Sequence, residues 1–230
     1  MQTFQQLQDE LKARLMVAAS STLFTPTRIA QLIQNAYIWA AGQFNWPQLE
    51  KAMLTNTFAG YFYYDYPPRF RNDSLTRLTV DDLKYKLIAF DDWLDFKEEN
   101  PNSTERFFAD YARQYFIFPT PTANGDKNIS IWGIEEATGL LQAGDETIFS
   151  RSDDRGNEAT VKKAFSVAIK KIDAKLAQAE EAEAVILLTN SYADYIKKQQ
   201  KYQRKDHPFL EVPDFFKGNG GTTERGSFNS

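Results

Sequence analysis

The sequence has no cysteine and a single histidine among its 230 residues. The absence of cysteine excludes disulfides, thiolate nucleophiles and cysteine-ligated zinc. One histidine cannot supply a multi-histidine metal site, and His207 precedes Pro208 without the serine or aspartate spacing that indicates a triad. Much of the chemistry of hydrolases and metalloenzymes is therefore excluded before any motif is considered.

Long apolar runs are also missing. No uninterrupted stretch approaches the ~18–20 residues that span a bilayer, and the first residues, MQTFQQLQDELKARL, are too polar for a secretory signal. We expect a soluble protein that is made in the cytosol and has no membrane partner.

The net charge of −4 is too small for a general duplex-DNA binder. Its distribution is uneven, because residues 1–156 carry 15 basic and 21 acidic groups, whereas residues 157–205 carry 10 and 6. Residues 206–230 carry 2 and 4. An acidic body thus precedes a basic helical segment and a mildly acidic tail.

Helical periodicity is present near both ends of the sequence. Apolar residues at three- and four-residue spacing predict a helix over 3–19, and Thr25 followed by Pro26 predicts the start of a second that stops near Gly42. Residues 157–205 predict further helix, with a break near 178–183.

The middle of the sequence is typical of strands and turns. Residues 54–66, rich in threonine and aromatics around Gly60, predict a hairpin. Further strands are expected over 74–81, 85–89, 107–110, 114–118 and 129–135, with a short helix over 91–98.

The expected fold class is α+β, mostly α. It is a helical bundle with a small inserted antiparallel sheet and an extended C-terminal arm. The expected divisions are the N-terminal bundle helices in 1–53, the β module in 54–156, the C-terminal bundle helices in 157–205 and the arm in 206–230.

Carboxylate pairs are the only candidate catalytic groups that the sequence offers. Asp91 or Asp92 could share a helical face with Asp95 and bind a hard cation. The simpler interpretation is that these acids complement the dipole of a helix N-terminus. Neither Asn124-Gly125-Asp126 nor the GNGG at 218–221 has the spacing of a calcium or dinucleotide loop. We expect no catalytic residue, metal or cofactor.

Several local sequences occur together in a recognisable order. A Phe44-Asn45-Trp46-Pro47 corner follows the first helices, and an aromatic segment closes at Pro67-Pro68. A strand then enters Pro119-Thr120-Pro121, and an alanine-rich helical pair completes the set. Over roughly residues 5–205 this order resembles the head–tail connector adaptor proteins of tailed phages.

The resemblance implies a structural virion protein with no enzymatic activity. It implies a closed ring of about twelve copies that docks on the portal protein at the virion neck. The tail, or its nozzle proteins, would bind below, and DNA would pass through the channel without specific binding.

Two surfaces are candidate sites under this interpretation. The aromatic and aliphatic residues of the arm are predicted to reach onto the portal or a neighbouring subunit; they are Phe209, Leu210, Val212, Phe215 and Phe216. The acids of the predicted short helix are predicted to line the DNA path; they are Asp91, Asp92, Asp95, Glu98 and Glu99.

Two other functions remain open from the sequence. A carbohydrate-binding or tail-fibre-associated module would use exposed tryptophans, with Trp46, Trp93 and Trp132 as the candidates, together with carboxylates. A cation-dependent hydrolase would be built on Asp91, Asp92 and Asp95.

Overall fold

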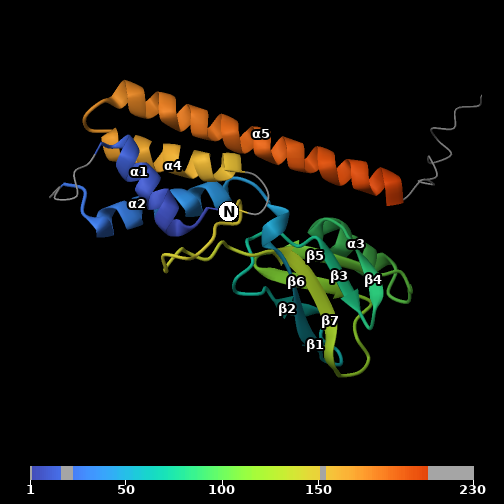
Figure 1. The fold of residues 1–230 in the computed structure, drawn as a ribbon. Helices are drawn as coiled ribbons and strands as arrows, with labels where there is room; N and C mark the ends of the chain where they lie inside the picture. Colours follow the sequence, from blue (N-terminus) through green and yellow to red (C-terminus); the bar gives the residue numbers. More distant parts are fainter. Residues whose placement is uncertain (1, 17–22, 151–153, 207–230) are drawn as a thin grey trace, which may run out of the picture. The chain divides into compact units, whose positions relative to one another are not determined.

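The computed structural model describes residues 2–16, 23–150 and 154–206. Two compact units make up the chain, residues 1–188 and 189–230. The elements in chain order (Figure 1) are α1 (Phe4–Arg14), α2 (Pro26–Gly42), a 3₁₀ turn (Pro47–Leu49), β1 (Glu50–Thr57), β2 (Tyr63–Asp65), β3 (Arg77–Val80), β4 (Leu83–Leu87), α3 (Phe90–Glu99), β5 (Phe107–Tyr111), β6 (Gln114–Phe118), β7 (Gly125–Ile134), α4 (Asp154–Ile169) and α5 (Ala174–Asp206).

Helices α1, α2 and α4 pack against one another and lie side by side in Figure 1. Thr3 caps α1 through a capping box with Gln6, and the predicted cap of α2 is confirmed, because the Thr25 hydroxyl accepts a hydrogen bond from the Arg28 amide. Their apolar stripes are fully buried at the contact, including Leu7, Leu11, Ile29 and Ile33.

The Trp46 corner joins the helices to the sheet. The indole Nε1 donates to the Ala40 carbonyl at 3.2 Å, and its ring packs edge-on against Phe149 at 5.1 Å. The Arg71 guanidinium, which follows β2, donates to the Ala41 and Phe44 carbonyls at the end of α2. The two parts of the first unit are therefore fastened by buried aromatic packing and charged hydrogen bonds.

The predicted fold class, a mostly helical bundle with a small antiparallel sheet, is wrong. The seven strands form one mixed, curled sheet in the order β1-β7-β3-β4-β5-β6-β2, in which β4 and β5 are parallel. The sheet has a buried side chain cluster on each face, one inside the curl and one under α3. The strands carry aromatic side chains on both faces, and a wide sheet that is packed on each face buries them.

The predicted hairpin over 54–66 is also wrong. β1 and β2 are joined by a short loop but occupy opposite ends of the strand order, where β1 pairs with β7 and β2 with β6. Two hydrogen bonds fix the loop between β1 and β2. The Gly60 amide donates to the Pro121 carbonyl, and the Phe58 amide donates to the Tyr64 hydroxyl. Long-range partners therefore override the local turn signal.

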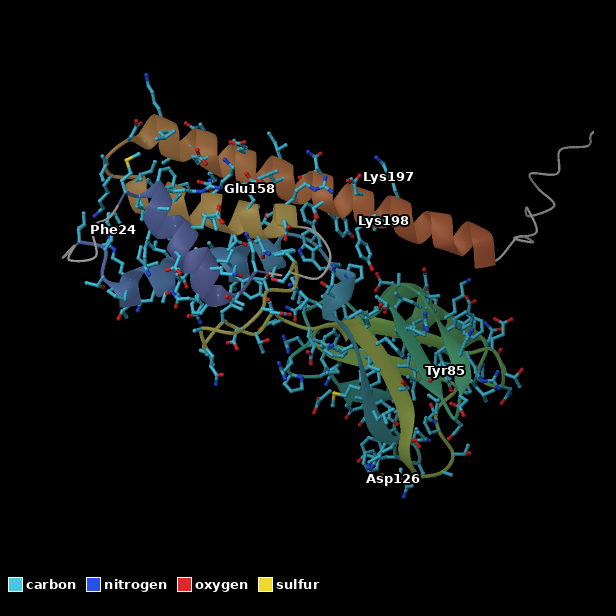
Figure 2. All side chains as sticks on the ribbon, in the orientation of Figure 1. Phe24, Tyr85, Asp126, Glu158, Lys197 and Lys198 are labelled. Atoms are coloured by element: carbon cyan, nitrogen blue, oxygen red, sulfur yellow. The ribbon has the colours of Figure 1, made fainter. Side chains whose placement is uncertain are left out.

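The break in the C-terminal helices lies earlier than predicted. α4 ends at Ile169, and α5 begins at Ala174, where the Asp173 carboxylate accepts a hydrogen bond from the Leu176 amide. The alanine-rich residues 178–183 continue α5, in keeping with their high helix propensity. In the second unit the described residues are the end of α5, from which Lys197 and Lys198 project in Figure 2.

Among the described residues no helix is both long enough and apolar enough to cross a membrane.

Candidate functional site

The five predicted acids of α3 are all exposed. Only Trp93 is buried on this helix, and Asp91 and Asp92 lie in its first turn, where they complement the helix dipole. Asp95, Glu98 and Glu99 follow over the next two turns, so the acids cover the face that the sheet does not touch. The structure therefore brings the predicted acidic residues together on one outward surface.

An aromatic layer fixes α3 on the outer face of the sheet. The Trp93 ring stacks near Phe90 and Phe62, at 6.2 and 5.9 Å between centroids, and the Phe96 ring packs against Phe107 at 4.7 Å. Lys97 Nζ lies 3.3 Å from the Phe62 ring centroid, and burial lowers the pKa of Lys97. This aromatic packing fixes the orientation of α3 on the sheet, and therefore the direction in which its acidic side chains point.

A row of aromatic side chains lies exposed along one end of the sheet. Phe58, Tyr61 and Tyr63 are 43–55% exposed, and their rings contact one another in series at 6.1 and 6.4 Å. At the other end of the row, Tyr111 stacks on Phe90 at 4.4 Å with half of its surface exposed. Exposed aromatics in contact with one another are typical of protein interfaces.

Strand β1 is exposed on both faces. Met53 is 40% exposed and Leu54 is 56% exposed, although successive side chains of a strand point to opposite faces. An edge strand with apolar residues on both faces is an unprotected pairing surface. Sequence reasoning placed Leu54 in the predicted hairpin over 54–66, left Met53 outside it and did not predict this exposed edge.

The helices carry a second uncovered apolar surface. Val167 of α4, Ile172 of the turn and Leu176 of α5 are 44–75% exposed. They lie beside a cavity of about 400 Å³ between α4 and α5, which Val167 and Ala177 line together with charged side chains. Sequence reasoning expected helix over all three positions, with a break only near 178–183, and did not predict this surface.

One cavity lies beside Tyr37 and the segment that precedes α4. It measures about 490 Å³ and is lined by Tyr37, Asp145 and Glu146 among others. Asp145 accepts hydrogen bonds at 2.7 Å from the Leu141 and Gln142 amides, which lower its pKa. Within the described ranges no group of three or more acidic or histidine side chains could hold a metal ion.

The predicted aromatic candidates differ in exposure. Trp46 and Trp93 are each 1% exposed, so neither can stack on a sugar. Trp132 is partly exposed, and the Arg77 guanidinium lies 5.5 Å from its ring. The arm residues Phe209, Leu210, Val212, Phe215 and Phe216 lie outside the described residues.

Comparison with family models gives no match, and comparison with curated proteins gives none either.

Proposed function

We propose that the chain is a subunit of the head-to-tail adaptor ring of a tailed phage, located at the virion neck between the portal protein and the tail. The observation that carries the proposal is β1, an edge strand that presents apolar side chains on both faces. A protein that worked as a monomer would cover or charge such an edge.

The kind of assembly is inferred from the resemblance to connector adaptors. The order of helix pair, Trp46-Pro47 corner, strands and alanine-rich helix pair is retained in the chain. In the first unit α4 packs against α1 and α2, although the whole sheet separates them in sequence. The carbohydrate-binding alternative loses its main support, because two of its tryptophans are buried.

The acidic face of α3 is proposed to line the DNA path. Five carboxylates and one lysine on ten residues give this helix a strong negative field, and like charge lets DNA pass without adhering. The outward placement of all five acids supports this role.

The ring proposal is tested by co-assembly with the portal protein on which the chain would dock. The full chain, a chain lacking 206–230 and a chain lacking only 218–230 are each mixed with the portal and sized. We expect the full chain and the shorter deletion to add a ring to the portal, because both keep the apolar arm residues. The deletion of 206–230 removes those residues and is expected to prevent co-assembly. Unchanged co-assembly without 206–230 would contradict the predicted role of the arm in docking.

The DNA-path proposal needs its own variants. Replacing the five α3 acids by their amides is expected to leave co-assembly intact and to slow DNA release from filled particles. Amide replacement of the exposed acids Asp81 and Asp82 in the β3–β4 turn and Asp126 on β7 is the control. A map of the assembled ring with α3 on its exterior would contradict this assignment.

A further inference from the structure

The curled sheet has an open seam between its two terminal strands, β1 and β2. Among the described strands β1 pairs only with β7 and β2 only with β6, so each has one edge of backbone amides and carbonyls without a ladder partner. A backbone edge of this kind is a template for another strand.

On the two sides of the seam, β1 and β2 both place side chains on the inner face of the sheet. Met53 and Thr55 stand opposite Ile131 and Ile129 of β7, which are fully buried. Directly opposed residues share a face, so Met53 and Thr55 point into the curl. On the other side Tyr64 stands opposite Tyr115 of β6, and the two rings stack at 5.3 Å.

A cavity of about 310 Å³ occupies this seam. Met53 and Thr55 line one wall and Tyr64 and Tyr66 the other, with Tyr115 and Ile131 also in its lining. Met53 is 40% exposed although it faces the core, because nothing in the described structure covers it at this edge. The inner face of the sheet is therefore incompletely filled along the seam.

The Tyr115 hydroxyl supports the same conclusion. It is buried and has no hydrogen-bond partner among the described residues, and burial raises the pKa of Tyr115. A buried donor without a partner costs about 1–3 kcal/mol. An acceptor that entered the seam beside it would remove this cost.

The required occupant is an extended apolar segment rather than a compact ligand. Two strand edges supply main-chain pairing along the seam, and the cavity between them accepts alternate side chains. Such a segment needs apolar residues at a spacing of two.

We propose that residues Phe209–Val212 of a second copy of this chain enter the seam as an added strand. Leu210 and Val212 would share one face and enter the cavity, whereas Phe209 and Glu211 would face outward. Of the stretches outside the described structure, 17–22 and 151–153 offer no such alternation of large apolar residues. His207 and Pro208 connect the end of α5 to the proposed strand, and the six residues 207–212 span at most about 20 Å when extended.

The choice of a second copy as the donor of this strand rests on the proposed function, because a ring places identical subunits side by side. Pro208 and Pro213 flank the proposed strand, and proline is tolerated at strand ends. A strand received from the next subunit would close the curled sheet and link successive copies head to tail around the ring.

Disulfide trapping tests the proposal directly, because the chain has no cysteine of its own. Full-length Met53→Cys and Leu210→Cys chains are mixed and oxidised over a series of concentrations, so that a mixed disulfide can form only between copies. Leu54→Cys replaces Met53→Cys in the matched control, since Leu54 lies on the opposite face of the same strand. We expect about a tenfold higher yield with position 53, because a disulfide requires adjacent side chains that point together.

Two outcomes would overturn the proposal. One is a yield at position 53 no greater than at position 54. The other is a disulfide that forms readily within a single Met53→Cys/Leu210→Cys chain but not between chains. That result would mean that the segment enters the seam of its own copy.

A binding measurement provides an independent readout. A labelled peptide of residues 207–216 is titrated into the full chain carrying Leu210→Asp and Val212→Asp, so that its own arm does not compete. We expect saturable binding that weakens about tenfold or more with Met53→Asp, after circular dichroism shows that this variant is folded. Absence of binding to the folded chain would overturn the proposal. Neither experiment uses the portal, so failure here with intact portal co-assembly would leave the proposed function standing.

Discussion

Gly156 lies in the first turn of α4, directly against the ring of Phe149. A β-carbon built there would lie 2.3 Å from two carbons of that ring, and Phe149 is itself buried between α2 and the Trp46 corner. Gly156→Ala is therefore expected to lower the free energy of unfolding by about 1–3 kcal/mol through overpacking.

Gly42→Ala at the end of α2 is the matched control for this prediction. An added β-carbon there meets nothing within 4 Å, so the higher helix propensity of alanine is expected to leave stability unchanged or slightly raised. Urea unfolding measures both variants, and equal midpoints for the two would contradict the packing described at Gly156.

Tyr66 and Asp110 form a buried polar contact inside the sheet. The Tyr66 hydroxyl accepts from the Ser74 amide at 3.0 Å and donates to the Arg71 carbonyl or to Asp110 Oδ2. Burial raises the pKa of Tyr66 to about 12 and also raises the pKa of Asp110 above its usual 3.8, with the Asp73 carboxylate adding to the shift.

The raised Asp110 pKa predicts a specific pH dependence. Between pH 3.8 and the higher folded-state pKa, the native state binds more protons than the unfolded state, so stability falls as the pH rises through this window. Asp110→Asn has no carboxylate at this position, so its stability does not fall for this reason. Urea unfolding of both chains is measured from acid to neutral pH. The free energy of unfolding of the natural chain minus that of Asp110→Asn is expected to decrease as the pH rises. A difference that increases with pH would contradict the prediction.

At the scale of elements, an ion-pair cluster holds α5 on α4. Lys162 Nζ lies 3.1 Å from Glu180 and 3.0 Å from Glu183, and the lysine side chain is 10% exposed. Burial lowers the pKa of Lys162, but the hydrogen bonds that Lys162 donates to the Glu183 and Glu180 carboxylates outweigh it and raise the pKa above 10.5. The stabilisation is therefore complete below pH 10.5 and is lost as the pH rises through the folded-state pKa.

Lys162→Met keeps the aliphatic stem and removes the charge. We expect a loss of about 1–3 kcal/mol, because Glu180 is left largely buried without its cation. Lys197→Met is the control, since Lys197 is 77% exposed and lies 4.0 Å from Asp194; its effect is expected within about 0.5 kcal/mol. Equal chemical-denaturation midpoints for the two variants would show that the cluster contributes nothing.

Element starts and stops were predictable where the signal is local. Thr25 and Pro26 define the start of α2 by capping chemistry, and Gly42 marks its end. Strand pairing was not predictable, because β1 pairs with β7, whose partner residues lie 68 to 84 positions further along the chain. Composition shows that a segment is extended, but the pairing depends on which distant strand completes the same buried face.

At the scale of the whole molecule, the candidate surfaces were predictable to different degrees. The exposed acids of α3 could be read from charge alone, whereas the seam beside Met53 depends on the curl of the sheet and has no local signature. The helix break at 170–173 was missed for a different reason: a break was expected near 178–183 from the length of the helical pattern alone, whereas the alanine-rich residues there favour a continuous helix.

The proposed role in assembly places the function on surfaces of the chain. Two uncovered apolar surfaces, on β1 and on the α4–α5 turn, are both in the first unit. In a ring, covering them would contribute roughly 25 cal/mol per Å² of apolar area removed from water.

The mass measured after the full chain is mixed with a portal protein tests the adaptor proposal most directly. The proposal predicts one portal oligomer carrying a closed ring of about twelve copies of this chain. A portal that keeps its own mass at saturating concentrations of the folded chain would contradict it.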